Sequence, residues 1–369
     1  MKRIPGASEA NLARSRNHSG SGLLCGSGDT TVANLPDDFP PTLVVVIDTE
    51  EEFNWSAPFS PSNNDVTAIQ EQGRAQEVYN KYGVRPLYAV DYPVAVNQDA
   101  CRVLGGFLRD GLCDIGTHLQ PWVNPPFEEE ISNFNSYPGN LPEELEVRKL
   151  EALTGAIEES FGIRPICYKA GRYGVGPATT KILEKLGYCI DLSVVPHSDF
   201  GADGGPDFRH CADRPYWFGG RGDLLEIPLS RGFVGLAAKY GRQLFPIIDS
   251  HLGRQLHFGG LVARARVLER ITLTPEGVDQ SAHRRLTKSL LASGHRIFSL
   301  TYHSSSLGIG GSPYVQDEQQ RRQFIIAIDA YLRFFRDEVG GTFSTPHQLY
   351  ETLVAIRHKH IQPDAATAG

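Results

Sequence analysis

Acidic, basic and histidine side chains directly follow several apolar segments of this sequence. The run Val44 to Ile47 leads into Asp48 and then Glu50. A carboxylate can act as a general base, a histidine can act as a general acid, and both can bind a metal ion. Comparable residues end later apolar segments: Asp91, His118, Arg172, Asp191 and His303. This recurrence favours one shared site over a separate solvated turn at each position.

Strand-like and helix-like segments alternate along most of the chain. Expected strands cover 42–48, 85–91, 113–118, 188–194, 224–230 and 296–304, with a strand and loop over 164–174. Expected helices cover 64–82, 98–110, 141–162, 177–186, 279–293 and 314–340, with a last one from Pro346. This order predicts a mainly parallel α/β sheet, and the number of units favours a (β/α) barrel. The carboxyl ends of barrel strands form the active-site face, where the residues above would meet.

The domain organisation follows from the same pattern. Residues 1–40, rich in Ser, Gly and Asn at the start, predict a disordered leader. A single barrel domain is expected over 41–356, with a loop insertion at 196–222 and a helical insertion at 236–268. Residues 357–369 are expected to form a flexible tail.

Composition excludes several classes of function. The net charge of −7 argues against a nucleic-acid partner. The chain has no apolar run of the ~18 residues that a membrane-spanning helix needs. It also lacks the glycine-rich motifs of nucleotide-binding loops. The N-terminus has no apolar signal-peptide segment, and the six cysteines form no CxxC pair, so we expect a cytoplasmic protein with reduced cysteines. The oligomeric state is not indicated.

Five short motifs resemble, in their order, those of the polysaccharide deacetylase family. They are DTE (48–50), GTHLQPW (116–122), GRYG (171–174), DLSVVP (191–196) and TYHSSSL (301–307). This family is carbohydrate esterase family four, with the NodB-homology fold. The resemblance covers about residues 42–350, and the blocks GPDF (205–208) and SPY (312–314) make it closest to the WalW-like subgroup. It implies a distorted (β/α)7 barrel and metal-assisted removal of an N- or O-acetyl group from a sugar or polysaccharide.

The resemblance also implies roles for individual residues. Asp48 would be the general base, and Arg172 would hold it ionised through a charge-assisted bond. His303 would protonate the leaving group, with Asp191 fixing its tautomer. Backbone N–H groups near Tyr173 would help bind the oxyanion.

Trp122 lies in a proline-rich loop next to His118. We expect Trp122 and Tyr173 to contact substrate, Trp122 by stacking on a sugar, although simple loop packing is an equally good interpretation of the tryptophan.

The metal motif departs from the family pattern. The position after Asp48, where the family has a second aspartate, is Thr49. The position four residues after His118 is Trp122 instead of a histidine, and Gln120 replaces the second histidine of the closer HxHPW pattern.

Glu50 and His118 therefore remain as the expected ligands of a divalent metal, which would be zinc by resemblance. Glu50 projects to the same side of its strand as Asp48, so Asp48 or Gln120 could complete the site. Catalytic zinc normally has three protein ligands, so both a metal-bound and a metal-free site remain open.

Three functions fit these observations. The first is a deacetylase-type hydrolase acting on an acetylated carbohydrate. The second is a metal-independent hydrolase of another C–N bond on the same fold. The third is a degenerate, non-catalytic glycan-binding member, which would have no chemical reason to keep Asp48, Arg172, Asp191 and His303 together.

Overall fold

Seven consecutive parallel strands form the centre of the computed structural model, which describes residues 30–53, 57–249, 260 and 264–361. In spatial order they are β11 (Ile297–His303), β2 (Thr42–Thr49), β3 (Leu87–Val90), β4 (Asp114–Leu119), β5 (Cys167–Ala170), β6 (Ile190–Asp191) and β8 (Leu224–Glu226). A short strand, β12 (Thr342–Phe343), pairs with the start of β2. This arrangement confirms the predicted α/β barrel with a parallel sheet.

An irregular segment brings the two edges of this sheet together. The backbone N–H of Leu229 donates to Val194, just after β6, and that of Ser230 donates to Ser299 in β11 at 3.4 Å. The hydroxyl of Ser230 accepts a second bond from the N–H of Ser299 at 2.9 Å. The barrel is therefore distorted at this junction, where individual hydrogen bonds take the place of a continuous β-ladder.

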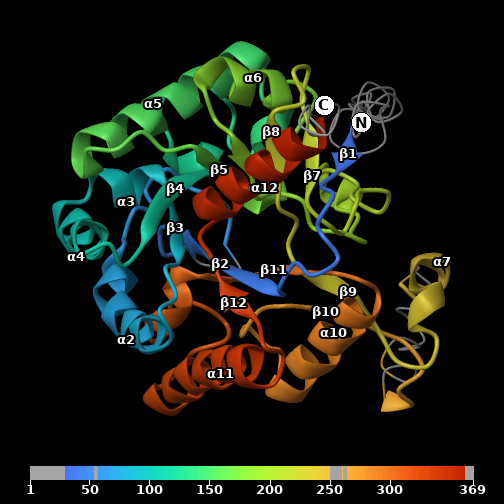
Figure 1. Ribbon diagram of the computed structural model, residues 1–369. Coiled ribbons are helices and arrows are strands. Elements are labelled where there is room, and N and C mark those ends of the chain that lie inside the picture. Colours follow the sequence, from blue (N-terminus) through green and yellow to red (C-terminus); the bar gives the residue numbers. More distant parts are fainter. Residues whose placement is uncertain (1–29, 54–56, 250–259, 261–263, 362–369) are drawn as a thin grey trace, which may run out of the picture.

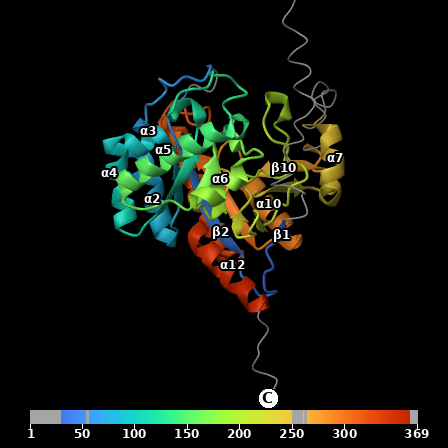
Figure 2. The same ribbon diagram turned by 90° about the horizontal axis from the view of Figure 1, so that it is seen from above.

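Helices surround the sheet, and Figure 2 shows α2 to α5 on one side, α6 near the middle and α7 at the opposite margin. Their bounds are η2 (Thr67–Glu71), α2 (Gln72–Tyr82), α3 (Tyr92–Val96), α4 (Gln98–Arg109), α5 (Glu143–Phe161), α6 (Thr179–Leu186), α7 (Gly241–Ile248), α10 (Gln280–Ala292), α11 (Glu318–Asp337) and α12 (Pro346–Ile361). The longest predicted helices match α5 and α11 closely. Helix α5 starts after Pro142 and ends at Gly162, whose φ of 70° suits a residue without a side chain.

Strand β2 explains how the core positions the site. All eight of its residues are buried, as expected for a parallel strand that is covered on both faces. Leu43, Val45 and Ile47 pack in the larger apolar cluster under the outer helices. Val44 and Val46 pack in a second cluster that includes α12 residues Leu349 and Leu353. Because side chains alternate, Asp48 continues the row of Val44 and Val46 beyond the apolar part of the barrel.

The chain ends differ from the predicted leader and tail. Residues 31–40 are not disordered: β1 (Thr31–Val32) pairs antiparallel with β7 (Tyr216–Phe218), and Ala33 is buried. Residues 357–361 belong to α12 instead of a flexible tail. Residues 1–29 and 362–369 lie outside the described part of the chain.

Both predicted insertions contain regular structure. The 196–222 insertion carries the 3-10 turn η6 (Gly201–Asp203) and strand β7, which is antiparallel to β8. The 236–268 insertion connects β9 (Arg231–Val234) to its antiparallel partner β10 (Glu269–Thr272) and contains η7 (Ala238–Tyr240) and α7. Figure 1 shows α7 at the edge of the molecule, while β9 and β10 lie against the barrel. Residues 250–259 and 261–263 of this insertion lie outside the described residues.

The cysteines are not all reduced thiols, contrary to the expectation. Four are free, namely Cys101, Cys113, Cys167 and Cys189, but Cys211 is disulfide-bonded. The cysteine argument for a reducing compartment therefore does not hold. No helix in the described residues is long and apolar enough to cross a membrane.

Candidate active site

Asp48 is a buried carboxylate that is held by a lysine from across the barrel. Lys169 lies in β5, and its ammonium donates to Oδ1 of Asp48 and to the hydroxyl of Thr301, the latter at 2.9 Å. Burial by itself would raise the pKa of Asp48, but the charges of Lys169, His118 and His303 outweigh it and hold that pKa below its ordinary value. Asp48 is therefore ionised at neutral pH.

His303 lies beside Asp48 because their strands pair in parallel register, with His303 opposite Asp48. Its Nε2 lies 3.9 Å from Oδ2 of Asp48 and 4.0 Å from Oε1 of Glu50. Its Nδ1 lies 2.9 Å from Oε2 of Glu276. The other carboxylate oxygen, Oε1, accepts the backbone N–H of His303 and the hydroxyl of Ser306. The carboxylate of Glu276 thus fixes the orientation of the ring.

Three carboxylates keep the His303 ring protonated. Burial would lower the pKa of His303, but the negative charges of Glu276, Glu50 and Asp48 overcome this effect and raise the pKa to about 10. The site therefore pairs an ionised acid with a protonated imidazole at neutral pH. That is the charge state required of a general base and a general acid.

Glu50 contacts the two polar residues at the end of β4. Its Oε2 lies 3.2 Å from Nε2 of His118 and accepts a bond from the amide of Gln120. Nδ1 of His118 faces the carbonyl of Lys169 at 3.2 Å. The other oxygen, Oε1 of Glu50, is buried without a hydrogen-bond partner among the described residues.

This donor set does not fit a zinc site. Among the described residues, no group of three His, Cys, Asp or Glu side chains is arranged to hold a metal ion. Gln120 directs its amide nitrogen, a donor, at the Glu50 oxygen that His118 also contacts. The ammonium of Lys169 already supplies a positive charge to Asp48. Glu50 and His118 are adjacent, as expected for ligands, but the third ligand that zinc normally requires is not provided.

Arg172 does not hold Asp48, which corrects the prediction. Its guanidinium donates to the hydroxyl of Ser136 at 2.6 Å and stacks on the ring of Tyr137 at 4.2 Å. The reason lies in the backbone after β5, where Arg172 and Tyr173 have positive φ angles of 54° and 59°. In this left-handed turn Arg172 contacts Ser136 and Tyr137, and Lys169 in the preceding strand takes the expected role.

Asp191 does not orient His303, which is a second correction. It is fully buried at the end of β6 and accepts bonds from the backbone N–H and hydroxyl of Ser193. Burial raises its pKa to about 6, and it lies beside a second buried acid, Glu226, whose pKa is also raised. The partner of His303 is Glu276 instead.

Trp122 is not available to stack on a sugar. Its side chain is only 2% exposed, its indole N–H donates to Glu51 at 2.6 Å, and its ring packs on Phe59 at 4.4 Å. The loop-packing interpretation is therefore correct for this residue. Tyr173, in contrast, lines the cavity next to His303.

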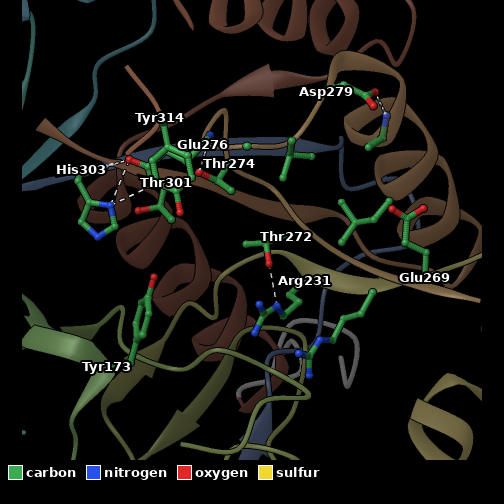
Figure 3. Close-up of a pocket in the computed structure, with 15 residues that line it drawn as sticks. Tyr173, Arg231, Glu269, Thr272, Thr274, Glu276, Asp279, Thr301, His303 and Tyr314 are labelled. Atoms are coloured by element: carbon green, nitrogen blue, oxygen red, sulfur yellow. Dashed lines mark hydrogen bonds and ion pairs between the residues drawn. The ribbon is translucent and has the colours of Figure 1, made fainter. Parts of the chain in front are cut away.

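A polar cavity of about 390 Å³ opens beside His303. Its wall includes Tyr173, Arg231, Arg270, Glu276 and Thr301. Figure 3 shows His303, Glu276 and Thr301 together at one end, with the hydroxyl end of Tyr173 directed toward them. The volume lies within the range of small-molecule sites, roughly 300–1,000 Å³.

Sequence reasoning missed two residues of this site. Lys169 carried a usable signal, because a lysine inside the buried strand CYKA must find a counter-charge. Glu276 lies in the loop after β10, where no local pattern marks it.

Comparison with known proteins identifies the fold. No family model and no curated protein matches the sequence. A solved structure of a candidate polysaccharide deacetylase from Mycobacterium smegmatis matches with a TM-score of 0.52 at 15% identity, covering 89% of this chain and 95% of that one. A candidate glycoside hydrolase/deacetylase from Parabacteroides distasonis matches with a TM-score of 0.54 at 11% identity, covering 88% and 74%. These structures support the predicted barrel, and they do not distinguish the WalW-like subgroup.

Proposed function

We propose that this protein is a carbohydrate deacetylase-type hydrolase, which cleaves an acetyl amide or acetyl ester on a sugar. The observation that carries this proposal is the pair formed by Asp48 and His303. An ionised carboxylate and a protonated imidazole face each other with 3.9 Å between Oδ2 and Nε2, at the ends of adjacent barrel strands.

The attacking water would bind between Asp48, Glu50 and His303. Oε1 of Glu50 is a buried acceptor without a hydrogen-bond partner in the described residues, and Nε2 of His303 lies about equally far from it and from Oδ2 of Asp48, at 4.0 and 3.9 Å. Buried acceptors of this kind normally bind a hydrogen donor. Asp48 would take the proton of the water as its oxygen bonds to the acetyl carbon.

His303 would complete the reaction by donating its Nε2 proton to the leaving nitrogen or oxygen as the C–N or C–O bond breaks. Glu276 stabilises the protonated ring before the step and holds it in position. The Tyr173 hydroxyl would bind the substrate oxygen on the cavity side. The products are acetic acid, which ionises to acetate, and the free amine or alcohol. Asp48 then returns the proton that it took from water to Nε2 of His303, which restores both groups for the next turnover.

This scheme contains no step through a metal, because the donor set around Glu50 and His118 falls short of a zinc site. Lys169 provides the positive charge that keeps Asp48 ionised. The observation favours the metal-independent hydrolysis that the sequence left open. Metal-free activation of water is therefore the form of the reaction that we propose.

The carbohydrate substrate is supported by the motif order and by the fold. The two structural neighbours carry names of carbohydrate-active proteins, and the cavity is open and polar.

The direct test is acetate release from N-acetylglucosamine, its short oligomers and O-acetylated xylose. We expect turnover that persists after dialysis against a chelator and that falls about 100-fold or more in Asp48→Asn and His303→Gln. Asp38→Asn, at an exposed position, serves as the matched control. Loss of activity on chelation with recovery on adding zinc would contradict the metal-free scheme. Sugar binding without acetate release would instead indicate the non-catalytic member.

A further inference from the structure

Arg231 is a partly buried cation that forms no ion pair with a carboxylate among the described residues, although Asp249 is near enough to act on its charge. It begins β9 and lines the cavity next to the catalytic pair. Its Nε donates to the hydroxyl of Thr272 at 2.7 Å, and its Nη1 donates to the hydroxyl of Ser198. Both partners are neutral. Within the described residues, no carboxylate lies at ion-pair distance from Arg231, and its Nη2 has no hydrogen-bond partner.

The acids that line the same cavity are already engaged by other groups. Glu269 pairs with Arg285 at 2.8 Å. Glu276 pairs with His303, and Asp279 caps helix α10 through the N–H of Ala282 at 2.9 Å. None of these carboxylates therefore compensates Arg231.

Arg270 adds a second positive charge on the neighbouring strand. Its guanidinium stacks on Phe245 at 4.3 Å, donates to the carbonyl of His197, and lies 3.8 Å from Asp249. Arg231 lies opposite Thr272 and Arg270 lies opposite Phe233, so the two arginines are diagonal neighbours on the β9–β10 pair. Figure 3 shows Arg231 below Thr272 on the side of the cavity that faces Tyr173. This end of the cavity therefore carries net positive charge.

A partly buried guanidinium that lacks an ion-pair partner is stabilised when a ligand supplies the counter-charge. Burial and the charge of Arg270 lower the pKa of Arg231 to about 10 and outweigh the smaller opposing influences of Tyr173 and Asp249, so Arg231 is charged at pH 7. A guanidinium with free N–H donors in a cavity matches the two oxygens of a carboxylate or phosphate.

We propose that the substrate carries an oxyanion, a carboxylate or a phosphate on the sugar, that binds Arg231 with Arg270 beside it. The same cavity holds His303 and Thr301 at its other end, so one ligand can place its anionic group on Arg231 and its acetyl group at the catalytic pair. This inference deepens the proposed function and rests on it for the sugar part of the ligand.

The test is calorimetric binding of three matched sugars, which needs no turnover. They are neutral N-acetylglucosamine, its 6-carboxylate and its 6-phosphate. We expect the protein to bind one of the charged sugars at least about tenfold more tightly than the neutral one, as expected for a charge-assisted contact. Arg231→Gln should reduce that preference to less than about threefold. Arg284→Gln, which removes a charge paired with Glu338 at the surface, should retain it.

The possible results distinguish a carboxylate from a phosphate, and they test the anion site separately from the hydrolase function. Preference for the carboxylate or for the phosphate identifies which group the site accepts. Equal binding of all three sugars by the wild-type protein overturns the inference, whatever the variants do. An unchanged preference in folded Arg231→Gln also overturns it. If the protein prefers a charged sugar but releases no acetate, the hydrolase proposal is refuted and the anion site stands. If it releases acetate from neutral sugars and shows no preference for charged ones, the anion site is refuted and the hydrolase proposal stands.

Kinetics provide a second measurement if the enzyme is active. Arg231 touches the anionic group and not the reacting atoms, so Arg231→Gln should raise KM for the charged sugar about tenfold and leave kcat within about twofold. A loss confined to kcat would contradict an anion-binding role.

Discussion

The ammonium of Lys169 reaches Asp48 from three strands away, across the interior of the barrel. Lys169 lies in β5 and Asp48 in β2, with β3 and β4 between them in the sheet. Both side chains are about 3% exposed. A buried carboxylate in this position would otherwise take up a proton, so the lysine is what makes Asp48 available as a base.

Removal of this cation should therefore abolish most of the activity. In Lys169→Met, the pKa of Asp48 should rise because burial is then less well opposed, and kcat/KM at pH 7 should fall about 100-fold or more. The acidic limb of the pH–rate profile should move to higher pH. The profile of kcat/KM against pH measures both effects.

Arg172→Gln provides the comparison for this prediction. Arg172 contacts Ser136 and Tyr137 and not Asp48, so its loss should leave the acidic limb in place. If Arg172→Gln moved that limb and Lys169→Met did not, our assignment of the Asp48 partner would be wrong.

Glu276 should control the basic limb of the same profile. His303 must be protonated to act as an acid, and its pKa is raised to about 10, with Glu276 as the largest raising influence. Wild-type activity should therefore persist through neutral pH and decline only near pH 10. In Glu276→Gln the pKa of His303 should fall, and the decline should begin at least about one pH unit lower.

The Asp191→Asn variant tests the alternative assignment. Asp191 lies beside Ser193 and Glu226, so its replacement should leave the basic limb unchanged. A shift of that limb in Asp191→Asn, with none in Glu276→Gln, would restore the role that the sequence suggested.

Local patterns were sufficient to predict the strands and the residues that end them. The alternation along β2 predicted that Asp48 and Glu50 share a side, and both do lie near His303. The apolar runs located β3, β4 and β11 within a few residues. These features depend on contacts between neighbours in sequence or between adjacent strands, which periodicity encodes.

The partners of the catalytic pair could not be predicted in the same way. Lys169 and Asp48 are separated by 121 residues, and Glu276 reaches His303 from a loop 27 residues earlier in the chain. Arg172 and Tyr173 also adopt a left-handed conformation directly after β5. Non-glycine residues seldom adopt it, so the sequence alone favours the wrong residue.

Lys149 should contribute strongly to stability through the loop that follows β4. Its ammonium is fully buried in α5 and donates to the carbonyls of Pro121, Asn124 and Pro126, and it pairs with Glu129 at 2.9 Å. Lys149→Met keeps the length of the side chain but leaves these acceptors without a donor. We expect the free energy of unfolding to fall by about 3–5 kcal/mol in urea titrations.

The neighbouring residue offers a matched control for this effect. Arg148 pairs with Glu128 at the surface, where the two side chains are 47% and 52% exposed. Arg148→Met should change the free energy of unfolding by less than about 1 kcal/mol. Similar losses in the two variants would show that Lys149 acts only as a solvated charge.

Glu146 should make the protein less stable as the pH rises. It is buried in α5, where its Oε1 accepts the hydroxyl of Thr179 at 2.7 Å, and burial raises its pKa to about 8. In the unfolded chain the pKa is about 4.3. Between these values the native state holds a proton that the unfolded state has lost, so the free energy of unfolding decreases from about pH 4.3 to pH 8.

Glu146→Gln resembles the protonated form and removes this dependence. Urea titrations at pH 5 and pH 8.5 should show the variant close to wild type at the lower pH and more stable at the higher one, by an amount on the order of 1 kcal/mol or more. Glu151→Gln, at an exposed position of the same helix, should show no such divergence. If wild type and Glu146→Gln had equal free energies of unfolding at both pH values, Glu146 would be ionised in the native state.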